Sequence, residues 1–231
     1  MTGDDLGEDR GKAMKDDPER TAGIDIAAQL NAALRDAVAD RVWLADSMAL
    51  AARSPAAVAR LFPAAGRRCG RGPLPQAGPG LAGWTVDDAV RVLLLTAMPL
   101  SGTALAEEVR ALYRYGDAAE KRAVLRALPS LDIGDGGVEL LHDAIRTNDP
   151  RLVAAALGPY AGHLGDEMWR QAVLKCVFMD IPLTVVAGLT GRADGELVRM
   201  LAGLADERGA AGRAMPPDAA ALLAELASRQ A

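Results

Sequence analysis

Aromatic side chains are scarce in this sequence, which limits the kind of core that it can build. Phe, Trp and Tyr make up 3% of the 231 residues, whereas Ala, Leu and Val dominate an apolar fraction of 50%. Strands favour aromatic and β-branched residues, while Ala and Leu favour helices. The composition therefore predicts an all-α protein with a core of closely packed helices.

Cysteine is nearly absent, and so are long apolar segments. Cys69 and Cys176 are the only cysteines and form no CxxC pair. This usage is typical of free thiols in a reducing compartment, so we expect a cytoplasmic protein. No apolar run approaches the roughly 18 residues that a membrane-spanning helix needs. We therefore expect no membrane span.

The usual signatures of catalysis are also missing. The sequence has no GxSxG, GxxxxGK[ST] or GxGxxG segment in a suitable context. Asp87 and Asp88 begin a DDxxD-like stretch, but Arg91 stands where the third magnesium-binding aspartate would be. His142 and His163 have no HxxxH or ExxH companion, so we expect surface or structural roles. We predict no metal site and no cofactor.

The N-terminal residues differ in composition from the rest of the chain. Residues 1–22 mix charged residues with glycine and hold few large apolar side chains. Such a segment buries too little surface to offset the entropy lost on ordering, so we predict a disordered tail. Residues 23–231 have the apolar content expected of a single folded domain.

Helical periodicity, capping residues and prolines divide this domain into short segments. Asn148, Asp149 and Pro150, for example, form a strong stop-and-restart signal. We predict ten or eleven helices in an irregular α-solenoid of stacked helical hairpins, similar to HEAT arrays, although no exact repeat is present. The expected helices cover residues 24–52, a segment that restarts at 54–55, and residues 85–97, 103–115, 117–128, 137–147, 150–160, 166–179, 182–189, 194–210 and 217–230.

The segment from 162 to 183 is predicted to contain a central helix. Apolar residues from Met168 to Met179 cover about half of its circumference. Gln171 and Lys175 form a narrow polar seam one turn apart. A lysine at such a position is either held in a structural ion pair or lines a ligand site, and both alternatives stay open. We expect residues 166–179 and 85–97 to be the most buried helices.

Other arginines offer candidate anion-binding positions. Arg41 falls in the apolar stripe of the expected helix 24–52, so it requires a carboxylate or an anion. Asp87 and Asp88 are the candidate partners for this arginine and for Lys175. Arg68 and Arg71 belong to a basic turn that either holds a phosphate or is simply solvated.

Several segments together resemble the EboA family of helical proteins from a bacterial gene cluster for a secondary metabolite. They are residues 61–74, 83–95, 113–131, 146–178 and 192–213, and the most specific part reads TNDP, PYA and WRQAVLK. Tyr160, His163, Gln171 and Lys175 match the family pattern. Gly158 replaces an asparagine of that pattern, and Trp169-Arg170 replaces a Phe-Asn pair, so no binding role is carried over to Gly158 or Arg170.

The resemblance implies a role beside the enzymes of the cluster. These include proteins similar to a UbiA-type membrane prenyltransferase, a TatD-type metal hydrolase, a dehydroquinate synthase and a sugar-phosphate isomerase. Our leading hypothesis is a noncatalytic accessory protein that binds such a partner or carries a small-molecule intermediate.

Two alternatives belong to other functional classes. In the first, the chain is an enzyme with a pocket lined by Tyr160, His163, Gln171 and Lys175, where Lys175 acts as a base or forms a Schiff base. In the second, it is a HEAT-like nucleic-acid binder. The net charge of −5 and the few aromatic residues argue against the second alternative.

Overall fold

The computed structural model describes residues 18–75, 78 and 80–230, with side chains from residue 26 to 229. Within this part of the chain there are twelve α-helices, four short 3-10 helices and no strands. The all-α prediction is therefore confirmed. Residues 1–17 of the predicted tail lie outside the description, and the first helix begins at Pro18, five residues before the expected start of the domain.

Two α-helices take the place of the single helix expected over residues 24–52. Helix α1 covers Pro18–Leu34 and α2 covers Arg41–Arg53. The 3-10 helix η1 at Pro55–Ala57 then leads into α3, Val58–Cys69. Asp40 starts α2 by accepting a hydrogen bond of 2.9 Å from the backbone N–H of Trp43. This break divides one expected helix into two. The helix expected over residues 182–189 is also wrong, because that segment holds the 3-10 helix Leu183–Val185 and α10 begins only at Leu189.

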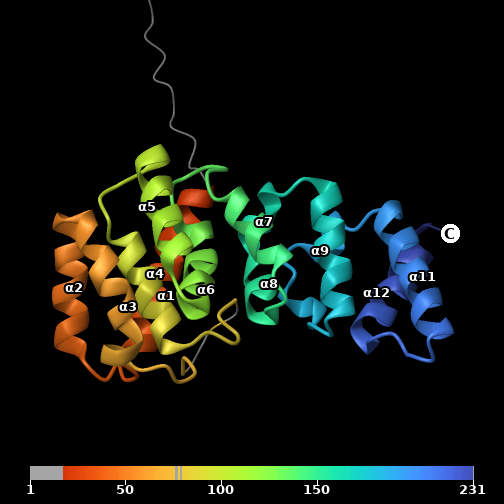
Figure 1. The fold of residues 1–231 in the computed structure, drawn as a ribbon, viewed down its shortest axis with the longest axis horizontal. Helices are drawn as coiled ribbons and strands as arrows, with labels where there is room; N and C mark the ends of the chain where they lie inside the picture. The colour runs from red at the N-terminus through yellow and green to blue at the C-terminus, as the bar shows by residue number, and fades with distance from the viewer. Residues whose placement is uncertain (1–17, 76–77, 79, 231) are drawn as a thin grey trace, which may run out of the picture.

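Helix α4, Val86–Thr96, is the centre of the N-terminal half. Ten of its eleven residues are buried, including Asp87, Asp88 and Arg91. Helices α1, α2, α3 and α6 all pack against it (Figure 1). The prediction that residues 85–97 form one of the most buried helices is confirmed.

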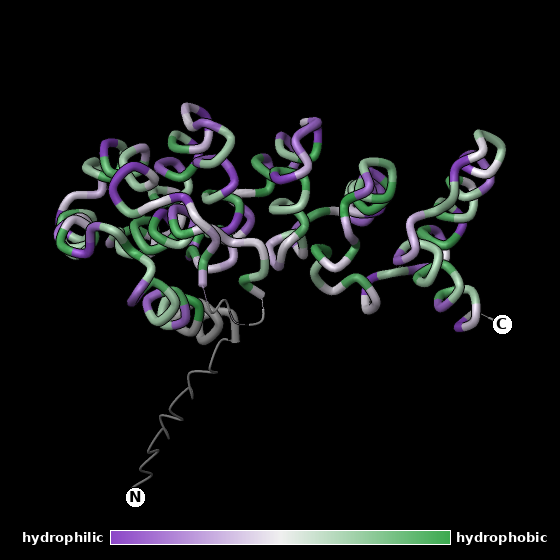
Figure 2. Tube along the Cα trace, turned by 90° about the horizontal axis from the view of Figure 1, so that it is seen from below, coloured by the Kyte–Doolittle hydropathy of each residue, from purple (hydrophilic) through white to green (hydrophobic). Residues whose placement is uncertain are grey.

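Helix α5 packs against α6 in this block, and helices α7 to α12 extend away from it along the long axis of the molecule (Figures 1 and 2). Helix α6 contacts α8, α8 contacts α9, α9 contacts α11, and α11 contacts α12. The arrangement agrees with stacked helical hairpins, while a HEAT-like solenoid stays a prediction. The elements are α5 Gly102–Tyr115, α6 Ala118–Ala127, η2 Leu128–Ser130, α7 Val138–Arg146, α8 Pro150–Ala156, η3 Pro159–His163, α9 Asp166–Phe178, η4 Leu183–Val185, α10 Leu189–Arg192, α11 Gly195–Ala210 and α12 Pro217–Gln230.

Helix α9 is less central than the sequence predicted. It buries Trp169 and four smaller side chains, but Gln171 is exposed and Phe178 is 70% exposed. The prediction that it ranks with α4 as the most buried helix is wrong. Helix α9 lies in the extended row between α8 and α11, so part of its circumference has no neighbouring helix to cover it.

Candidate functional site

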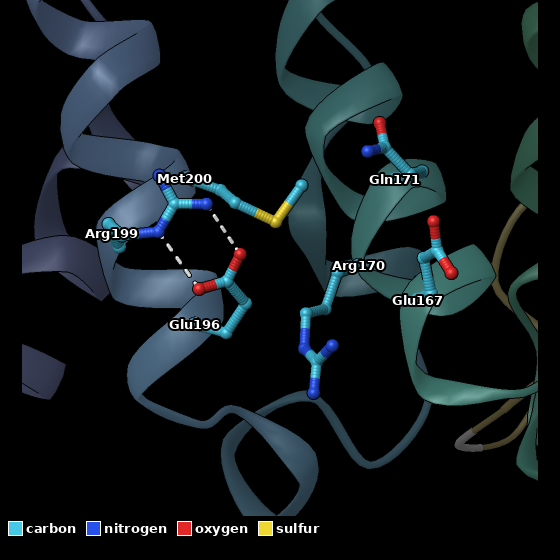
Figure 3. A pocket seen from close by; sticks show the side chains of 6 residues that line it. All are labelled: Glu167, Arg170, Gln171, Glu196, Arg199 and Met200. Atoms are coloured by element: carbon cyan, nitrogen blue, oxygen red, sulfur yellow. Dashed lines mark hydrogen bonds and ion pairs between the residues drawn. The ribbon is translucent and has the colours of Figure 1, made fainter.

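A groove of about 400 Å³ lies between α9 and α11. Figure 3 shows Glu167, Arg170 and Gln171 on the α9 side, and Met200 reaching from α11 toward α9. Glu196 and Arg199 complete the α11 side. The walls thus combine two acids, two arginines, an amide and a thioether.

An ion pair joins the two walls at the base of α11. The Arg170 guanidinium donates two hydrogen bonds to the Asp194 carboxylate, at 3.0 and 2.5 Å. Asp194 also caps α11 by accepting from the backbone N–H of Leu197 at 3.0 Å. The hydrogen bonds from Arg170 and Leu197 lower the pKa of Asp194. The carboxylate is therefore ionised at neutral pH and links the start of α11 to α9.

Arg192 makes a second connection to α9, in which α9 provides the acid, Asp166, and Arg192 provides the positive charge. Its guanidinium donates to the backbone carbonyls of Ala161 and Leu164 and to the Asp166 carboxylate, the last at 2.8 Å. The same group lies 4.9 Å from the centre of the Trp169 ring. Helix α9 thus provides one acid and one arginine, and residues 192–194 provide their partners.

The polar side chains of the groove differ in whether they have a hydrogen-bond or ion-pair partner within the chain. Arg199 donates two hydrogen bonds to Glu196 one turn away, at 2.9 and 2.6 Å. By contrast, Glu167 and Gln171 have no side-chain hydrogen bond or ion pair with any part of the chain that the structure describes. These two side chains are the ones that can bind another molecule without first losing an internal partner.

The four residues proposed for an interhelical pocket have different environments. Tyr160 is buried, and its hydroxyl donates to Gly134 O at 2.6 Å and accepts from Gly137 N at 3.0 Å. His163 is exposed beside it, with ring centres 4.6 Å apart. Lys175 Nζ donates to the backbone carbonyl of Ile145 at 2.7 Å, rather than to Asp87 or Asp88. Of the four, Gln171 lines the groove between α9 and α11.

The predicted arginines lie on the surface. Arg41 is not inside an apolar stripe: its side chain is 60% exposed and pairs with the exposed Asp36 at 2.9 Å. The reason is the break at residues 35–40, after which α2 no longer continues the helical wheel of α1. Arg68 lies 3.6 Å from the Asp40 carboxylate, and Arg71 is exposed.

Neither a metal site nor a membrane span is evident in the described residues. No three His, Cys, Asp or Glu side chains there lie close enough to hold an ion. No helix in the same part of the chain has the length and apolarity needed to cross a bilayer.

Comparison with known families places the groove in context. The family described as "Metabolite traffic protein EboA" matches residues 76–224, which is more than half of the chain and includes both walls of the groove. The chain belongs to the EboA family. No curated protein and no solved structure matches it.

The EboA segment also contains a buried charge network that the sequence analysis did not predict. Asp88 has no exposed surface and binds both Arg122 and Arg126, at 3.0 and 2.5 Å. Its Oδ2 atom also accepts from the backbone N–H of Thr85 at 3.1 Å, within a capping box that starts α4. The box joins residues three apart in the sequence, but the sequence carries no signal for two arginines that arrive from α6.

The second half of the network surrounds Arg91. Its guanidinium contacts Asp87 at 2.5 Å and Glu120 at 3.9 Å, and it donates to the Phe62 carbonyl at 3.1 Å. Burial alone would raise the pKa of Asp87, but hydrogen bonds from Thr85 and Arg91 outweigh burial and lower the pKa. Three acids and three arginines balance across the whole network. In this EboA protein, the arrangement connects α4 to α3 and α6.

Proposed function

We propose that this EboA protein is a noncatalytic accessory protein that binds a small-molecule intermediate between α9 and α11. The observation that carries the proposal is a groove of about 400 Å³ with two polar side chains, Glu167 and Gln171, that have no partner in the described part of the chain. Its volume is within the range of about 300–1,000 Å³ that is typical of small-molecule sites. The family description, which names metabolite traffic, supports the same role.

The ion pairs at the base of the groove hold its two walls in place, which favours a binding site. The Arg170–Asp194 pair connects α9 to the N-cap of α11, and the Arg192–Asp166 pair connects α9 to the end of α10 just before it, which limits how far the two walls can move apart. Preorganised walls lower the entropy that is lost when a ligand binds. Met200 adds apolar surface for a carbon skeleton.

The noncatalytic part of the proposal is supported by the state of the reactive groups. Burial and the nearby Asp218 raise the pKa of Cys176 to about 12, so the thiol stays protonated at neutral pH. The amine of Lys175 is bonded to a backbone carbonyl. The groove side chains without a partner among the described residues are a carboxylate and an amide, which can form hydrogen bonds with a bound molecule.

We propose that the protein acts in the cytoplasm, where enzymes of a gene cluster would supply or receive the bound intermediate. A UbiA-like membrane prenyltransferase is one such candidate partner. Direct binding of a cluster enzyme to the same face is part of this proposal.

Native mass spectrometry tests the binding function. The purified full chain would be incubated with a metabolite extract of the source cells and compared with Met200→Trp, which fills the groove. Val42→Trp is the matched control, because Val42 is 73% exposed on α2, outside the groove. We expect the wild type and Val42→Trp to retain a common small-molecule mass that Met200→Trp loses. Retention of no mass, or of equal amounts by all three, would contradict the proposal.

A further inference from the structure

We infer that the molecule bound between α9 and α11 carries a protonated amine and that Glu167 recognises it. This inference rests on the proposed function and adds the chemical class of the ligand. It follows from which charges in the groove are already neutralised and which are not.

The balance of charge at the groove is negative. Arg170 is held by Asp194 and Arg199 is held by Glu196, in both cases through two hydrogen bonds. Glu167 adds a third carboxylate that has no partner among the described residues. The lining itself holds two carboxylates and two guanidinium groups, but Arg170 is neutralised by Asp194 from outside the lining, so the unbalanced charge at the groove is that of Glu167.

An anionic ligand fits this arrangement poorly. To reach Arg199 it must displace Glu196 from two charge-assisted hydrogen bonds. It must also approach the unpaired carboxylate of Glu167, and like charges at a few ångströms repel. A protonated amine instead finds an acceptor without breaking any internal pair.

An organic cation also fits better than a metal ion. The described part of the chain has no set of three His, Cys, Asp or Glu side chains that could surround a metal. Gln171, four residues from Glu167 on α9, offers an amide that can donate to or accept from a neighbouring polar group of the ligand. Met200, on the opposite wall, has a thioether that can contact apolar atoms of the ligand. An amine on a compact carbon skeleton satisfies all three side chains.

Three probes with the same cyclohexane ring differ mainly in charge, so they test whether the charge of the ligand decides binding. Cyclohexylamine, cyclohexanol and cyclohexanecarboxylate would be tested by ligand-observed NMR with the full chain at pH 7. We expect the amine to bind most tightly. Glu167→Gln should weaken its binding about tenfold, since a hydrogen bond to a charged group is lost. Glu207→Gln, which removes the same charge from an exposed position of α11 outside the groove, should leave binding unchanged.

The outcomes distinguish this inference from the proposed function. Stronger binding of the carboxylate or the alcohol overturns the amine assignment, and so does a failure of the amine to bind. Equal weakening by Glu167→Gln and Glu207→Gln overturns the role of Glu167, because it would report only the net charge of the chain. The extract experiment with Met200→Trp does not depend on ligand charge. A retained mass there, together with failure of the amine, leaves the proposed function intact and removes only this inference.

Discussion

Replacing Asp88 by asparagine should destabilise the fold strongly. Asparagine keeps the shape of the side chain and an oxygen that can accept from Thr85 N, but it removes the negative charge between Arg122 and Arg126. Those two arginines are only 12% and 16% exposed, so water cannot fully replace the carboxylate. Breaking a buried ion pair typically costs about 3–5 kcal/mol. We expect a loss of about 3 kcal/mol, because Arg122 keeps Thr85 Oγ1 and Arg126 keeps Gly83 O as acceptors.

Urea unfolding followed by circular dichroism measures this cost. With a slope of about 3 kcal/mol per molar urea, the midpoint should fall by about 1 M. The matched control is Asp36→Asn, which removes the carboxylate from an ion pair with Arg41 whose members are 89% and 60% exposed. That change should cost under about 1 kcal/mol. Equal midpoints for the two variants would refute the reasoning that burial makes the Asp88 charge essential.

Three further predictions concern a buried aromatic, an acid and the thiols. Trp169→Ala should cost about 3–5 kcal/mol in thermal unfolding, whereas Phe178→Ala should cost little because Phe178 is 70% exposed; equal melting temperatures would contradict the packing. The pKa of Asp87 is lowered from 3.8, so the stability that its ionisation provides should be complete above about pH 5 and be lost progressively as the pH falls further. An Asp87→Asn variant should lose less stability between about pH 5 and acid pH than the wild type, and an equal loss would show that Asp87 is not the source. Burial, with smaller contributions from nearby acids, raises the pKa of Cys69 to about 11 and of Cys176 to about 12. Alkylation by iodoacetamide at pH 8 should therefore be at least roughly 100-fold slower in the folded chain than in urea, and comparable rates by mass spectrometry would show accessible thiols.

The helices were largely predictable because their signals are local. Asp149 and Pro150 start α8, and the residues 166–179 predicted as a helix agree with α9 to within one residue. Asp117 and Glu120, three residues apart, form the capping box that starts α6. The single expected helix over residues 24–52 fails, since the turn at 35–40 depends on the cap by Asp40 and on packing against α4.

The environment of each charge was much harder to predict. The helical wheel placed Arg41 in an apolar stripe because it assumed an unbroken helix, yet Arg41 is on the surface. Asp88 meets Arg122 and Arg126 from 34 and 38 residues away, a distance over which the sequence has no periodicity to follow. The residues that line the groove were hard to predict for the same reason. The sequence alone indicates Gln171 as a ligand-binding candidate, whereas Glu167 becomes one only because α11 lies opposite it in the fold.

The central claim is that the space between α9 and α11 binds a metabolite, and the methyl group of Met200 reports on that space directly. The chain would be labelled with ¹³C-methyl methionine, and its eight methionine signals followed while the metabolite extract is added. Met200→Leu assigns the relevant signal. We predict that the Met200 resonance shifts and saturates, while Met48 and Met98, which lie on α2 and just after α4, stay unchanged. An unmoved Met200 signal, or shifts confined to the other methionines, would contradict the claim.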